Sequence, residues 1–181
     1  MKKILAFSGS NSSKSINQTL VSIASQVVKN HKVTVIDIRD FPAPIYGEDL
    51  EGDSGIPEKI AELRTLMDEH DAFIFSTPEH NGYIPAVAKN TFDWLSRTEG
   101  KFFGEKPVLL LSTSPGGYGG ANTLNVLKGL APWWGAEVVG TYSLGSFYDK
   151  VTDGKLEEEE LSKLTTNINA LENALSEKAE A

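Results

Sequence analysis

Short apolar segments that alternate with helix-patterned segments constrain the fold of this chain more than any other feature. Apolar runs of this length are typical of parallel strands that are buried on both faces. The sequence holds five of them, at residues 3–8, 33–38, 72–76, 108–112 and 137–142. Consecutive parallel strands need long crossover connections, which are usually helices. The alternation therefore predicts an α/β fold built on a doubly wound parallel sheet.

Helical spacing of apolar residues is found between these runs and after the last one. The expected helices lie at residues 16–27, 60–67, 85–96, 122–130 and 161–175. Pro57 suits the start of the second helix, where a missing N–H costs little. The segment 39–56 has no such spacing, is acidic and is rich in Pro and Gly, so we expect it to be flexible.

Size and composition limit the classes of function. The 181 residues show no internal repeat, which predicts one domain spanning residues 1–181. A net charge of −8 without a basic block argues against a nucleic-acid partner. No apolar run approaches the roughly 20 residues that span a bilayer, and the run after Met1 is too short for an export segment, so we expect no membrane association and a cytoplasmic location. The chain has no cysteine, so redox chemistry would need a bound cofactor.

Three loops of unusual composition mark one edge of the expected sheet. Ligands of doubly wound sheets bind beyond the carboxyl ends of the strands, near the point where the strand order reverses. The loops at that edge are residues 8–15, 77–84 and 112–120. We therefore expect the binding site to be built from them.

The first loop is rich in hydroxyl groups and leads into the first expected helix. A helix N-terminus offers unpaired N–H groups and a positive dipole end, both of which suit a phosphate. The alternative is a serine-rich turn with Ser15 as the helix N-cap. The candidate phosphate-binding residues are Ser8, Ser10, Ser15, Asn17, Gln18 and Thr19.

Comparison with known phosphate-binding motifs narrows the class of possible ligands further. A Walker loop needs Gly-Lys-Ser/Thr after its glycines, and the dinucleotide fingerprint needs three spaced glycines, whereas this turn has only Gly9. A receiver domain would carry acidic residues at positions 8–10. One phosphate held mainly by neutral donors favours a mononucleotide such as FMN.

The second and third loops suit a flat ring. Asn81 and Gly82 could contact the polar edge of an isoalloxazine, and His80 and Tyr83 could pack against its face. Residues 116–120 contain four glycines, which allow the backbone to approach a planar ligand. The alternatives are a stiff turn between two prolines for the second loop and a mobile surface loop for the third.

These loops resemble those of the NADPH-dependent FMN reductase family of flavodoxin-like proteins, which includes quinone, chromate and azo-dye reductases. The family's first loop has the form G-S-x-R-x-x-S-x-N, which is met by Gly9, Ser10, Ser15 and Asn17. Its second has the form P-E-Y-N-x-S-x-P-G-x-L-K-N-A-x-D-W, which is met by Pro78, Glu79, Asn81, Pro85, Lys89, Asn90, Asp93 and Trp94. The departures include Ser12 for the family's Arg, His80 for Tyr, Tyr83 for Ser and Ala86 for Gly.

The resemblance implies a flavodoxin-like, three-layer fold with five parallel strands in the order 2-1-3-4-5. It implies that the first loop binds the phosphate of FMN and that NADPH or NADH is the co-substrate. The flavin carries the chemistry, so no catalytic side chain is expected. A small-molecule electron acceptor and a homodimer or homotetramer are implied as well. The residues implied to line the ring and ribityl chain are Pro78, Glu79, His80, Asn81, Gly82, Ser112, Ser114, Gly116 and Gly117.

Two other functions stay open at this point. A flavodoxin-type one-electron carrier would share the fold and would suit the acidic composition. An α/β interaction protein that has lost its ligand would also share it. Among the remaining polar residues, Lys89 and Asp93 are predicted to form a surface ion pair on one helix. His31 and His70 are predicted to face solvent, and no metal site is expected.

Overall fold

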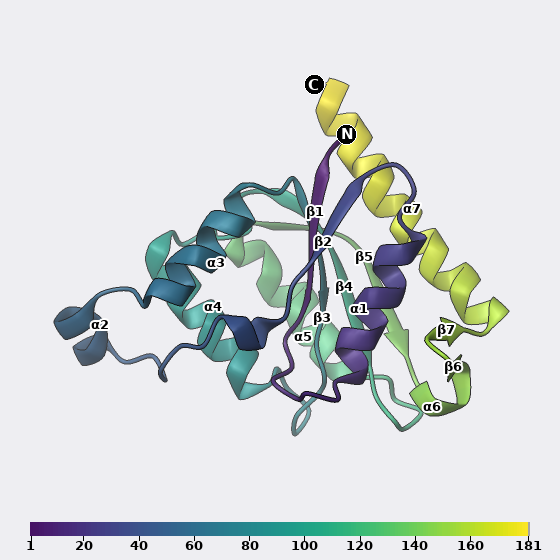
Figure 1. Ribbon diagram of the computed structural model, residues 1–181, viewed down its shortest axis with the longest axis horizontal. Helices are drawn as coiled ribbons and strands as arrows, with labels where there is room; N and C mark the ends of the chain where they lie inside the picture. The colour runs from purple at the N-terminus through teal and green to yellow at the C-terminus, as the bar shows by residue number, and fades with distance from the viewer. Residues whose placement is uncertain (181) are drawn as a thin grey trace.

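The computed structural model describes residues 1–180 and is built on one five-stranded parallel sheet (Figure 1). The strands lie in the order β2-β1-β3-β4-β5, which confirms the expected order and the flavodoxin-like fold. Each strand pairs in parallel with its neighbours. The strands are β1 (Lys3–Ser8), β2 (Lys32–Val35), β3 (Ala72–Ser76), β4 (Lys106–Thr113) and β5 (Ala136–Leu144).

Two separate cores fill the space between the sheet and its helices. Side chains alternate between the two faces of a strand, so Leu5 and Phe7 belong to one core while Ile4 and Ala6 belong to the other. The first core lies under α3 (Glu58–Asp68), α4 (Ala86–Thr98) and α5 (Ala121–Leu130). The second lies under α1 (Ile16–Val27) and α7 (Glu158–Glu180) (Figure 1). All five expected helices are present.

The segment between α1 and α3 differs in two places from what the sequence predicts. The second strand ends at Val35 and not at residue 38, because the carboxylate of Asp37 accepts the Arg39 N–H at 2.9 Å and starts the short helix η1 (Ile38–Asp40). The segment expected to be flexible contains the helix α2 (Glu48–Ser54). An ion pair between Glu51 and Arg97, 2.9 Å, ties α2 to α4.

The segment after β5 contains structure that the apolar pattern did not predict. A one-turn helix, α6 (Phe147–Lys150), leads into a small antiparallel hairpin of β6 (Val151–Thr152) and β7 (Lys155–Leu156). Between α5 and β5, the short helix η2 (Ala131–Trp134) places Trp134 against Phe92 and Phe102. Within the described residues, no helix is both long and apolar enough to cross a membrane.

The two histidines that precede strands do not face solvent, so that prediction is wrong. The His70 ring is buried between α3 and β2, where Nδ1 lies 2.6 Å from the Leu66 carbonyl and Nε2 lies 3.0 Å from Thr34 Oγ1. His31 is half-buried, and both of its ring nitrogens are buried. Each histidine lies in the short connection between a helix and the next strand, where the chain turns back against the sheet. The predicted ion pair between Lys89 and Asp93 is present on α4.

Candidate functional site

A cavity of about 300 Å³ lies at the carboxyl edge of the sheet, where the loops after β1, β3, β4 and β5 meet. It brings together seven of the residues predicted for the site. They are Ser10, Ser15, Asn17, Pro78, Glu79, His80 and Ser114. The other residues that line it are Ser12, Lys14, Ile16, Thr113, Pro115 and Tyr148.

The start of α1 presents free donors to this cavity. Ser15 is the N-cap, and its Oγ accepts the Gln18 N–H at 3.1 Å. The N–H groups of Ile16 and Asn17 have no acceptor among the residues that the structure describes. Such groups, at the positive end of a helix dipole, form an anion-binding site.

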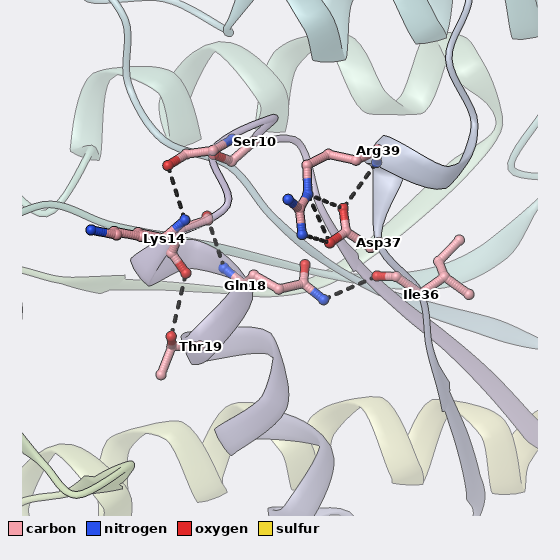
Figure 2. Close-up of polar contacts among 9 residues, drawn as sticks. Ser10, Lys14, Gln18, Thr19, Ile36, Asp37 and Arg39 are labelled. Carbon is pink, nitrogen blue, oxygen red and sulfur yellow. Dashed lines mark hydrogen bonds and ion pairs between the residues drawn. The ribbon is translucent and has the colours of Figure 1, made fainter.

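The loop before α1 is shaped by its own serines. Ser10 Oγ accepts the Ser12 N–H at 3.3 Å, and Ser12 Oγ accepts the Lys14 N–H at 3.2 Å (Figure 2). These bonds fold the segment into a tight turn and leave each hydroxyl hydrogen available to a ligand. Lys14 is exposed and supplies a positive charge at the cavity.

Two predicted residues of this region turn away from the cavity. The Gln18 side-chain amide donates to the Ile36 carbonyl at 3.0 Å, and Thr19 Oγ1 donates to the Ser15 carbonyl at 3.3 Å (Figure 2). Both line a neighbouring hollow of about 320 Å³ that also contains Asp37 and Arg39. Arg39 forks onto Asp37 there, and its hydrogen bonds hold the pKa of that carboxyl below its usual range. Gln18 therefore fastens α1 to the end of β2.

Asn17 lies inside the fold, with 1% of its surface exposed, at the base of the cavity. Its Oδ1 accepts the Ser76 hydroxyl at 2.8 Å and the Thr113 N–H at 3.1 Å, and its Nδ2 donates to the Thr113 carbonyl at 3.0 Å. Ser112 is also buried, and its hydroxyl donates to the Thr77 carbonyl at 2.6 Å. We call Asn17, Ser76, Thr77, Ser112 and Thr113 the inner network. It fastens α1, β3 and β4 together beneath the cavity.

Ser8 and Gly9 also belong to the interior of the fold. The Ser8 hydroxyl is buried and has no hydrogen-bond partner in the described structure. A Cβ at Gly9 would lie 2.8 Å from Ala88 Cβ and 2.9 Å from the Phe75 ring, so glycine is needed here for α4 to pack against the end of β1. The packing of α4 against the end of β1 therefore accounts for the tight turn.

The second loop is a two-residue hairpin. His80 and Tyr83 exchange two backbone hydrogen bonds of 3.0 Å, and the residues between them, Asn81 and Gly82, have φ of 53° and 76°. Positive φ at both central positions is typical of a type I′ turn, which Asn-Gly favours. The turn places Asn81 and Gly82 at an exposed tip outside the cavity lining, whereas His80 lines the cavity.

Glu79 connects the second loop to α5. Its carboxylate accepts the Asn122 N–H at 3.1 Å, the Thr123 N–H at 3.3 Å and the Asn122 side-chain amide at 3.0 Å. A carboxylate at a helix N-terminus is stabilised by the unpaired N–H groups and the dipole. Since both oxygens of Glu79 are engaged, its negative charge is already compensated at the cavity wall.

The third loop is folded around Ser114. The Ser114 hydroxyl accepts the Gly119 N–H at 3.0 Å and donates to the Gly116 carbonyl at 2.9 Å. Gly116 and Gly117 are exposed and, like Asn81 and Gly82, do not line the cavity. We call His80, Asn81, Gly82, Gly116 and Gly117 the outer rim. In the described chain, no cluster of His, Asp or Glu is suited to a metal ion.

Sequence reasoning missed Tyr148 and Thr113. Thr113 ends β4, one residue beyond the strand that was expected to end at Ser112. Tyr148 follows β5 on α6, and the rule that ligands bind at the carboxyl ends of parallel strands applies to the fifth strand as well. That rule, extended to the loop after β5, was the signal available for finding it.

Comparisons with known proteins agree with this geometry. Residues 2–149 match the model of the NADPH-dependent FMN reductase family. An uncharacterized protein of Mycoplasma pneumoniae is 33% identical over 144 residues, which cover 77% of this chain and 84% of that protein. The NAD(P)H-dependent FMN reductase of Pseudomonas aeruginosa is 34% identical over 120 residues, which cover 66% of this chain and 63% of that enzyme.

The solved structure of FerB, a flavoenzyme NAD(P)H:(acceptor) oxidoreductase of Paracoccus denitrificans, has the same fold. It superposes over 98% of both chains with a TM-score of 0.77 at 24% sequence identity. Together with the family match, these relatives define a flavodoxin-like oxidoreductase class. The chain belongs to the NADPH-dependent FMN reductase family.

Proposed function

We propose that this protein binds FMN at the carboxyl edge of its sheet and uses it to transfer electrons from NAD(P)H to flavins, quinones or similar small acceptors. The observation that carries the proposal is the cavity itself. It joins the N-terminus of α1 to the second and third loops at the position where the family motifs fall. The activity stated in the names of the relatives supports the reaction class.

The residues at the base of the cavity fit a phosphate. The N–H groups of Ile16 and Asn17 are free of internal acceptors, and the hydroxyls of Ser10, Ser12 and Ser15 stand around them. Lys14 supplies a positive charge, and the carboxylate on the cavity wall, Glu79, is compensated by α5. A phosphate monoester therefore meets several donors and a lysine, while the Glu79 carboxylate on the wall is hydrogen-bonded to α5.

The outer rim and the third loop fit a flat ring. Pro78 and the His80 ring offer apolar and aromatic surface, and the tip at Asn81 and Gly82 offers exposed polar backbone. We assign Ser112 and Asn17 to the support of this site, because their side-chain groups are engaged in the inner network. Gln18 and Thr19 support the first loop in the same way.

The chain's own part in the reaction is to bind and orient. FMN, when bound, supplies the hydride and electron-transfer chemistry. Donors at the start of α1 fix the phosphate, and the second and third loops set the angle at which the ring is presented. The side chains lining the cavity include no carboxylate free to act as an acid or base. NAD(P)H and the acceptor would react in turn at the same site, so we expect ping-pong kinetics.

The visible spectrum of the purified protein, before and after anaerobic NADPH or NADH, tests the proposal. We expect a yellow protein, or one that quenches added FMN fluorescence, whose flavin absorbance bleaches within the mixing time and returns when a quinone is added. A flavin that stays oxidised would instead support a flavodoxin-type electron carrier. A colourless protein that leaves FMN fluorescence unquenched would contradict both functions.

A further inference from the structure

Tyr148 stands at the mouth of the cavity and belongs to neither family motif. Its side chain is 68% exposed, yet it lines the same cavity as the start of α1 and residues 113–115. A tyrosine in such a place offers an apolar ring face and a hydroxyl donor, both available to a ligand.

The backbone that carries Tyr148 is fixed to the third loop. The Ser146 N–H donates to the Gly116 carbonyl at 2.9 Å, and the Phe147 N–H donates to the Ser114 carbonyl at 3.1 Å. The Phe147 ring is buried in the second core and contacts the Tyr148 ring edge-on, with centroids 5.5 Å apart. The backbone contacts of Ser146 and Phe147 therefore place Tyr148 beside the third loop.

Two further contacts hold the ends of this turn. A Cβ at Gly145 would collide with the carbonyl group of Gly117, so only glycine allows the turn to lie directly on the third loop. At the end of α6, Lys150 Nζ lies 2.6 Å from Glu160 Oε1 at the start of α7. The loop after β5 thus packs on the third loop and forms a fourth wall of the site.

The rest of the cavity lining indicates which part of a ligand Tyr148 meets. The exposed tips at Asn81, Gly82, Gly116 and Gly117 lie outside the lining, whereas residues 14–17 at the start of α1 lie within it. The cavity therefore contains the phosphate end of the proposed site, and from the second loop only Pro78, Glu79 and His80 line it. In this chain Ser12 stands where the family motif has arginine, so the phosphate has more need of other donors.

We infer that Tyr148 is a direct ligand of FMN, which packs its ring along the ribityl chain and donates a hydrogen bond from its hydroxyl to the phosphate. This inference rests on the proposed function, because it assumes that FMN occupies the cavity. The phosphate would then accept a hydrogen bond from a neutral tyrosine hydroxyl in the loop after β5.

Flavin titration of the 181-residue chain, freed of bound flavin and followed by fluorescence quenching, tests the inference with FMN and with riboflavin, which lacks the phosphate. Tyr148→Phe removes only the hydroxyl, so we expect FMN to bind about ten-fold more weakly and riboflavin to bind unchanged. Tyr148→Ala removes the ring as well, so we expect both flavins to bind more weakly. Thermal unfolding of each variant checks that the fold is kept.

Trp133→Ala is the matched control. Trp133 is 80% exposed on η2, which precedes β5 and so lies at the opposite edge of the sheet. We expect this variant to bind both flavins as the parent does. Equal effects of Tyr148→Phe on FMN and riboflavin, or none, would overturn the donor role, and unchanged binding by Tyr148→Ala would overturn the contact altogether. A parent protein that quenches neither flavin would refute the proposed function itself, which is a different result.

Discussion

The inner network and the outer rim lie at the same edge of the sheet but use their polar groups differently. In the inner network, buried side chains such as Asn17 and Ser112 are hydrogen-bonded to neighbouring strands. In the outer rim, the side chains of His80 and Asn81 are exposed, His80 beside the cavity and Asn81 at the tip of a hairpin. The difference teaches that the loops of one site mix buried residues that hold the strands and helices together with exposed residues that make no such contacts.

Replacement of Asn17 is expected to produce the largest effect on the inner network. Asn17→Ala removes three hydrogen bonds and leaves the Ser76 hydroxyl and the Thr113 N–H and carbonyl buried without partners. We expect the free energy of unfolding to fall by about 3 kcal/mol, measured by urea denaturation.

Ser10→Ala is the comparison on the exposed side, because Ser10 contributes one weak bond at a half-buried position. We expect its unfolding free energy to stay within about 0.5 kcal/mol of the parent. Similar losses in the two variants would show that the inner network has no special part in stability.

The contacts of Glu160 next to α6 predict a smaller, pH-dependent effect on the free energy of unfolding. Burial of the Glu160 carboxyl raises its pKa, but hydrogen bonds from Lys150, Tyr142 and Lys163 outweigh burial and lower the pKa to about 2. Because this pKa lies below the ordinary 4.5, Glu160 stabilises the fold fully above about pH 5 and loses this effect as the pH falls toward 2.

At pH 3 the loss from Glu160 is expected to reach about 2 kcal/mol. Urea denaturation between pH 7 and pH 3 measures it as the difference between the parent and Glu160→Gln, since other carboxyl groups titrate in both proteins. The variant is expected to be less stable at pH 7 and to approach the parent at pH 3. Parallel pH curves for the two proteins would contradict the assignment.

Glu79 is expected to give the smallest effect, because its contacts are partly exposed. Glu79→Gln removes the charge that caps α5, and we expect a loss of about 1 kcal/mol in unfolding free energy. A double-mutant cycle with Asn122→Ala checks the mechanism, since the two losses should add to more than the loss in the double variant. Strict additivity would show that the two side chains act independently.

Most of the fold was predictable because it follows from regular apolar patterns. The five strands and the five long helices follow from buried residues at strand or helix spacing, whereas the strand order followed from the family resemblance. The end of β2 was not predictable, because Asp37 caps η1 through a hydrogen bond that the spacing of apolar residues does not encode. The α6 turn and the hairpin after it are too short to show a period.

The site was predictable as three loops but not as a set of side chains. Position in the third loop could not distinguish Ser112, whose hydroxyl bonds to the neighbouring strand segment, from Ser114, which lines the cavity, because that depends on the pleat and on where β4 ends. His70 was misplaced because its partners, Leu66 and Thr34, come from two elements that meet only in the folded chain. Tyr148 was missed because it comes from a segment without a recognisable motif.

The two ends of the described chain lie near one another, on the side of the sheet opposite to the cavity (Figure 1). Lys3 opens β1 at that edge, and near the end of α7 Lys178 contacts Glu137 at 2.7 Å and the Glu105 carbonyl at 2.6 Å. A surface anchor attached to either end would therefore hold the molecule with its cavity mouth turned toward the solution. Protein immobilised in this way on an electrode or bead would keep its ligand-binding edge open to dissolved donors and acceptors.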